Sequence, residues 1–126
     1  MEKVRGILTR EGVSVAVVPA DDVTLVFEAI QGDGETVAEK SETGPEPMMG
    51  FSVEQYYSIN TTAEYSGRIE IRIICPLSML FYTDVTKVKL WQYEKAGWKD
   101  LGARFVAKYN LIIGVTDHLS IFGVTR

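Results

Sequence analysis

The chain has 126 residues, which is the usual size of one domain and too short for two independent cores of ordinary size. Hydrophobic residues make up 46% and charged residues 24%, values that exclude wholesale disorder and a fibrous repeat. No apolar stretch approaches the roughly 18 residues of a spanning helix, so no membrane insertion is expected. We therefore expect one folded domain over residues 1–126.

Charge is distributed unevenly along the chain. The formal net charge of −4 argues against a general grip on nucleic-acid phosphates, and no nucleic acid is expected as a partner. Residues 28–54 hold seven acidic residues against one lysine, whereas residues 85–126 hold seven basic residues against three acidic ones. A solvated acidic loop and ordinary lysines on strand faces explain this asymmetry, and so does head-to-tail contact with a neighbouring module.

Period-two alternation of apolar and polar residues runs through almost the whole sequence. The clearest case is Ile69, Ile71 and Ile73, which alternate with charged residues and are expected to face the core. Runs that predict strands occur, in chain order, at 4–8, 13–18, 23–28, 51–59, 69–73, 87–93, 103–108, 111–115 and 120–125. No segment shows a convincing helical repeat.

Turn-forming clusters separate these runs. A Lys-Ala-Gly turn that ends at Gly97 predicts a hairpin between residues 90–93 and 98–101. Residues 39–49, which include two prolines, break the pattern and predict the longest irregular loop. Many short strands at this spacing predict an all-β, antiparallel, two-sheet β-sandwich of immunoglobulin-like appearance.

Four segments occur in an order that is typical of one family. They are Tyr-Tyr-Ser-Ile-Asn-Thr-Thr-Ala at 56–63, Tyr-Ser-Gly-Arg-Ile-Glu-Ile at 65–71, Lys-Leu-Trp-Gln-Tyr-Glu at 89–94 with Gly97 and Trp98, and Thr-Asp-His-Leu-Ser-Ile-Phe-Gly-Val at 116–124. Over roughly residues 48–126 the chain resembles the β-sandwich module found, often near the C-terminus, in large bacterial and archaeal secreted or surface proteins.

This resemblance implies a role and a location. The role is a non-catalytic structural or protein-interaction module of a larger surface or exported protein, with neighbouring domains or other proteins as partners. The location implied is extracellular or at the cell surface. If Met1 is the native start, the expected location is instead cytoplasmic.

The chain departs from the family pattern at residues 75–83, where the family has a short acidic connection. Large apolar residues fill this segment, which is unusual for a surface loop; they are Leu77, Met79, Leu80, Phe81 and Tyr82. The segment is either an additional core strand or a patch that pairs with another copy. The simplest form of the second alternative is a two-fold homodimer through Leu77, Met79 and Phe81.

Three aromatic residues lie on or beside the expected hairpin. Strand parity places Trp91 and Tyr93 on the face opposite Leu90 and Gln92. If that face is exposed, Trp91, Tyr93 and Trp98 are candidate ligand-binding residues that stack on sugar rings. The alternative is that Trp91 and Tyr93 belong to the core. A carbohydrate-binding module is therefore the second function considered.

Neither reactive side chain predicts catalysis. Cys75 is the only cysteine, which excludes an internal disulfide, and its place at a strand end predicts a buried, inert thiol. His118 is the only histidine, and at the entry to the last strand its imidazole is expected to bridge backbone groups. Because no nucleophile, base and oxyanion donor can be assembled, we expect neither enzyme activity nor a cofactor.

Residues 31–35 carry oxygen atoms that suit calcium, among them those of Asp33 and Glu35. They lack the full spacing of an EF-hand loop, and a simple Asp-Gly turn explains the same residues. No metal site is predicted, and calcium binding at Asp33 and Glu35 is left open.

Overall fold

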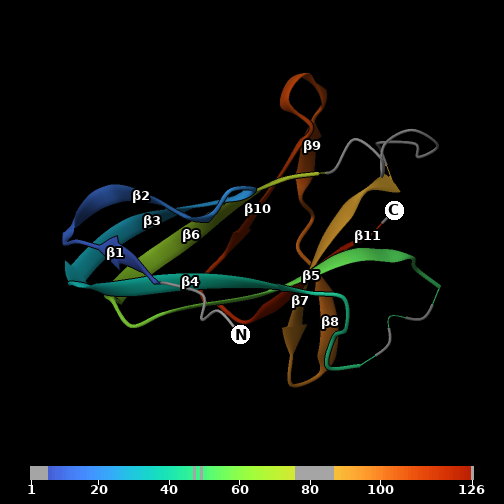
Figure 1. Cartoon of the computed structure of the whole chain (residues 1–126), viewed down its shortest axis with the longest axis horizontal. Coiled ribbons are helices and arrows are strands. Elements are labelled where there is room, and N and C mark those ends of the chain that lie inside the picture. Colours follow the sequence, from blue (N-terminus) through green and yellow to red (C-terminus); the bar gives the residue numbers. More distant parts are fainter. Residues whose placement is uncertain (1–5, 47, 49, 76–86, 126) are drawn as a thin grey trace.

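The computed structural model describes residues 6–46, 48, 50–75 and 87–125. Within these ranges the chain forms eleven strands in two antiparallel sheets, which Figure 1 shows as two layers, and one 3₁₀ helix, η2 (Ala107–Tyr109). The six-stranded sheet has the order β1 (Ile7–Thr9), β4 (Gly34–Ser41), β5 (Val53–Thr61), β11 (Ile121–Thr125), β7 (Lys89–Glu94) and β8 (Gly97–Asp100). The five-stranded sheet has the order β2 (Gly12–Ala20), β3 (Val23–Gly32), β6 (Glu64–Ile74), β10 (Leu111–Thr116) and β9 (Arg104–Val106).

The two sheets pack their apolar faces together, and the alternation of residues in the strands accounts for this packing. In β6, Ile69, Ile71 and Ile73 are each exposed by 1% or less. Arg68, which directly precedes this run, is exposed. In the six-stranded sheet, Leu90 of β7 is fully buried. One cluster of buried residues contains side chains of both sheets. Burying each such side chain contributes about 1.5–3 kcal/mol. The predicted all-β, two-sheet sandwich is confirmed.

A glycine allows the sheets to approach where β10 crosses β7. A Cβ atom placed on Gly114 would lie 2.8 Å from Leu90 Cδ2, closer than carbon atoms normally come. Any larger residue at position 114 would therefore force the Leu90 side chain to shift.

The last described strand, β11, lies inside the six-stranded sheet. It pairs with β5 on one side and with β7 on the other, and all of these pairings are antiparallel. The two halves of this sheet, β1-β4-β5 and β7-β8, are therefore joined only through β11 among the described strands.

Several strand boundaries differ from the sequence prediction by a few residues, and two of the differences are larger in kind. Residues 34–41 form β4, where no strand was predicted, so the irregular loop begins after Ser41 rather than at residue 39. The buried residues of β4 are only Thr36 and Ala38, which are too small and polar to give a recognisable strand pattern in the sequence. Backbone pairing with β5 stabilises the strand. The run at 103–108 ends as a strand at Val106, because η2 follows it.

The apolar segment that contains Leu77, Met79 and Phe81 lies outside the described residues. The homodimer expected through it, and the alternative of an additional core strand, both stay predictions. Among the residues that are described, no helix is long and apolar enough to cross a membrane.

Candidate functional site

Five aromatic rings gather on the outer face of the six-stranded sheet. This aromatic cluster consists of Phe51, Tyr56, Trp91, Tyr93 and Trp98. The ring centroids are 4.8 Å apart for Phe51 and Trp91, 5.1 Å for Tyr93 and Trp98, and 5.8 Å for Tyr56 and Trp98. These separations are those of favourable tilted and edge-to-face aromatic pairs.

The strand parity expected for β7 is correct. Leu90 and Gln92 are fully buried, while Trp91 and Tyr93 are half-buried on the opposite face. The structure places the three predicted residues on one face of the sheet, and β8 puts Trp98 directly opposite Tyr93. Sequence reasoning missed the other two rings, since they come from a distant strand and loop.

The chain between β4 and β5 covers part of this cluster. The indole Nε1 of Trp98 donates to the backbone oxygen of Glu46 at 3.2 Å. Met48 is buried over Gly123 of β11, where an added Cβ would lie 2.9 Å from Met48 Cε. Trp91 is fixed by a bond of 2.9 Å from its Nε1 to Thr125 Oγ1. The rings are thus held in fixed orientations and presented partly to solvent.

A charged rim borders the exposed side of the aromatic cluster. Lys89 Nζ lies 5.8 Å from the ring centroid of Phe51 and 5.6 Å from that of Trp91, and it pairs with Asp100 at 3.2 Å. Phe51 is 40% exposed. An apolar ring surface next to a fixed cation and a carboxylate is chemically suited to a ligand with both apolar faces and hydroxyl groups.

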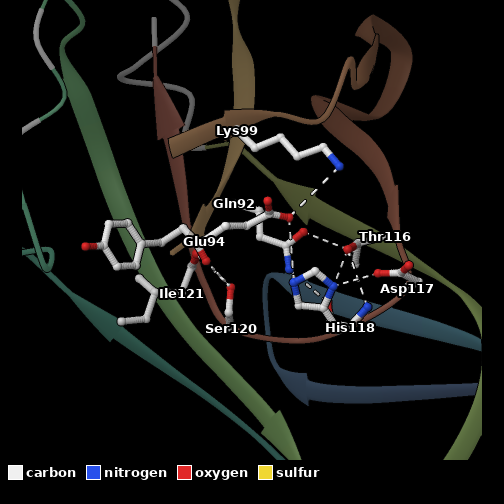
Figure 2. A network of polar contacts seen from close by, with 9 residues as sticks. Gln92, Glu94, Lys99, Thr116, Asp117, His118, Ser120 and Ile121 are labelled. Carbon is white, nitrogen blue, oxygen red and sulfur yellow. Dashed lines mark hydrogen bonds and ion pairs between the residues drawn. The ribbon is translucent and has the colours of Figure 1, made fainter. Parts of the chain in front are cut away.

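A buried glutamine ties the two sheets together beneath this region (Figure 2). Gln92 is 0% exposed, and its Nε2 donates to the backbone oxygen of His118 at 2.9 Å. Its Oε1 accepts the hydroxyl of Thr116, on β10 of the facing sheet, at 2.6 Å. Ser120 Oγ donates to the backbone oxygen of Tyr93 at 2.9 Å. These bonds fix the turn that leads into β11.

His118 takes part in this network differently from the expectation. Its backbone oxygen, not its imidazole, accepts the bonds from within the sandwich. The imidazole points to the surface, where Nδ1 lies 2.6 Å from Asp117 Oδ1 and Nε2 lies 3.7 Å from Glu94 Oε1 (Figure 2). The hydrogen bond to His118 lowers the pKa of the exposed Asp117 carboxyl. The backbone oxygen of His118 thus makes the bonds within the sandwich, while its imidazole pairs with carboxylates at the surface.

Cys75 has the buried position expected from the sequence. It is 2% exposed, directly after β6, and burial raises the pKa of its thiol to about 11. Its backbone nitrogen donates to the backbone oxygen of Asn110 at 2.7 Å. The group that nucleophilic chemistry requires, the thiolate, is therefore disfavoured here.

The Asp33 carboxylate accepts a hydrogen bond from the backbone of the connection between β1 and β2. Its Oδ1 accepts the backbone nitrogen of Glu11 at 2.8 Å, and Glu35 lies on β4 beside it in sequence. Across the described ranges no group of three or more His, Cys, Asp or Glu side chains is arranged to hold a metal ion. Calcium binding at Asp33 and Glu35 finds no further support in this geometry.

A second surface lies at the edge of the sandwich that β1 and β2 form. We call it the open edge and define it by Ile7, Leu8, Val13 and Val18, which are 39%, 55%, 80% and 53% exposed. β1 belongs to the six-stranded sheet and β2 to the five-stranded sheet, so both layers contribute to this surface (Figure 1). Among the described strands, each of these two pairs with another strand on one side only.

Comparison with protein family models, curated proteins and solved structures gave no match. The two surfaces of the chain itself, the aromatic cluster and the open edge, are therefore the basis on which a function is inferred.

Proposed function

We propose that the protein is a non-catalytic structural or protein-interaction module of a larger surface or exported protein, with an immunoglobulin-like sandwich. The observation that carries the proposal is the open edge. Of the eight large apolar side chains that the described chain leaves exposed, four lie on β1 and β2. Apolar side chains that gather at one sheet edge are typical of a surface that meets another protein.

The use of the reactive groups supports a non-enzymatic role. The backbone of His118 and the side chains of Gln92 and Thr116 are occupied in holding the sheets together. The Cys75 thiol is buried and held in its neutral form. The side chains of Gln92 and Thr116 thus serve the stability of the framework.

Site-directed photo-crosslinking in the cells that make the protein tests this function. A photo-crosslinking amino acid at Leu8, on the open edge, should give discrete crosslinked protein products. The matched control is the same amino acid at Lys95, which is also solvent-exposed but lies in the turn between β7 and β8. Equal products from both positions, or none from Leu8, contradict the proposal.

The second candidate function is carbohydrate binding, and the aromatic cluster favours it. Trp91, Tyr93 and Trp98 share one outward face with a neighbouring cation and carboxylate, as ring stacking on sugars requires. The partial cover by the chain around Met48 limits the exposed ring surface, so the protein-interaction role ranks first.

A further inference from the structure

We propose that the partner of the open edge is a second copy of this chain, joined by antiparallel pairing of the two β2 strands around a two-fold axis. This inference rests on the proposed interaction function and specifies its surface and partner. The pairing would extend the five-stranded sheet across both copies.

The four sheet edges of the sandwich differ in how far they can accept another strand. β1 and β9 are three residues long, and β8 is four residues long and carries Lys99 and Asp100. Short strands and charged side chains are the usual means by which proteins block edge pairing. β2 is nine residues long and has no charged residue from Gly12 to Ala20. Among the edges formed by the described strands, it is therefore the one least protected against pairing.

Two features of β2 limit the length of the pairing. Ser14 has a left-handed backbone with φ of 50°, and the register with β3 shifts between Val17 and Ala20, as at a bulge. Pro19 has no backbone N–H to donate. The stretch of this edge that is regular in backbone and register is therefore Val15 to Val17, which predicts a weak association rather than a permanent dimer.

The charges at the ends of β2 favour a copy in the antiparallel direction. Arg10 precedes the strand and Asp21 follows it, and both side chains are exposed without a described ion pair. Antiparallel pairing brings the start of one strand to the end of the other, so Arg10 of each copy comes near Asp21 of its mate. Asp22 is already paired with Lys40 at 3.0 Å. A parallel arrangement would instead place the two Asp21 carboxylates together.

The apolar side chains of the open edge add to this pairing. Val13 and Val18 flank the regular stretch of β2, and Leu8 lies on the adjoining strand β1. Two-fold symmetry buries each of these side chains twice, so a small surface on one copy contributes two equal contacts. Because β2 has no like charges to oppose each other, the same surface is complementary to itself.

Sedimentation of the purified full chain from about 1 µM to about 1 mM tests the proposal, a range that spans weak association. We expect reversible dimerisation, weakened at least about tenfold by Val18→Lys, because a lysine would be placed in the paired edge. The matched control is Val115→Lys on β10, since Val115 is 46% exposed on the same sheet but away from the edge. Thermal unfolding of each variant shows whether it is folded.

A charge exchange tests the direction of pairing. Arg10→Asp and Asp21→Arg should each weaken the dimer, and the double variant should recover at least part of the lost affinity. Amide hydrogen exchange supplies a local measurement, because those amides of Val15 to Val17 that point away from β3 should exchange more slowly as the protein concentration rises.

Three results would overturn the proposal. They are a strict monomer up to the highest concentration, a dimer that Val115→Lys weakens as much as Val18→Lys does, and a dimer that Phe81→Ser but not Val18→Lys dissociates. None of these removes the protein-interaction function itself. That function fails if crosslinking at Leu8 yields no protein partner, or yields the same products as crosslinking at Lys95.

Discussion

The phenolic hydroxyl of Tyr57 donates a hydrogen bond of 2.9 Å to Asp22 Oδ2 and thereby joins β5 of one sheet to the turn between β2 and β3 of the other. Lys40 Nζ lies 3.0 Å from the same oxygen. Tyr57 is 1% exposed, and burial, followed by the bond and the charge of Asp22, raises the pKa of its hydroxyl.

Replacement of Tyr57 by phenylalanine should destabilise the protein by about 1–3 kcal/mol, because the Asp22 carboxylate loses a donor in a largely buried place. Urea unfolding at pH 7 measures this change. Tyr109→Phe is the control, since Tyr109 is 61% exposed, and it should leave the free energy of unfolding almost unchanged. Equal effects of the two substitutions would mean that the bond to Asp22 contributes nothing.

Stability should fall as the pH rises above 9, and Cys75 should account for part of the loss. The folded-state pKa of its thiol is raised from 9.0 to about 11, so its contribution is fully present below pH 9 and is lost between 9 and about 11. One such group gives a slope of at most about 1.4 kcal/mol per pH unit. Urea midpoints from pH 7 to 11 should show a shallower decline for Cys75→Ala. An unchanged slope would show that the thiolate is tolerated in the fold.

Ile71→Ala should cost about 2–5 kcal/mol, because Ile71 is 0% exposed at the centre of β6 and the substitution leaves a cavity. Ile74→Ala is the matched control at the end of the same strand, where the side chain is 48% exposed. Chemical unfolding with an unaltered denaturant slope measures both variants. A loss below about 0.5 kcal/mol for Ile71→Ala would place the wrong face of β6 in the core.

Thr116→Val should destabilise the protein by about 1–3 kcal/mol. The substitution removes the hydroxyl that donates a hydrogen bond to Gln92 Oε1 in the buried space between the sheets. The effect should be strongly non-additive with Gln92→Leu, because both substitutions break the same bond. A double-mutant cycle of unfolding free energies measures this coupling. Additive losses would indicate that the two residues stabilise the protein independently.

Glycan-array binding should identify any carbohydrate ligand, and Tyr93→Ala should abolish that binding without unfolding the protein. Tyr93 contributes one of the half-buried rings of the aromatic cluster, whereas Tyr109 is an exposed tyrosine outside it. Tyr109→Ala is therefore the control. Equal binding by both variants, or no binding by the unaltered protein, removes the carbohydrate alternative.

Local patterns predicted those parts of the fold that depend on single strands. Alternation placed Ile69 to Ile73 in the core, and strand parity separated Trp91 from Leu90 correctly. β4 was missed because Thr36 and Ala38 give it too little apolar character, and its pairing with β5 supplies what its own sequence lacks.

The contacts that shape the candidate surfaces depend on residues far apart in the chain. Met48 lies over Gly123, and Trp98 bonds to Glu46, so neither partner carries a local signal of the other. The open edge follows from which strands have no second neighbour, which is a property of the sheet order and not of any one segment. Sequence periodicity specifies the faces of strands but not their neighbours.

The central position of β11 in the six-stranded sheet has a consequence for the order of events during synthesis. The strands β1, β4 and β5 can associate early, and β7 can form its hairpin with β8, but residues 121–125 are needed to join these two units. A nascent chain that stops at residue 120 would hold two separate sheet fragments, each with an unpaired edge. Among the described strands, the five residues of β11 are therefore the ones whose synthesis completes the six-stranded sheet.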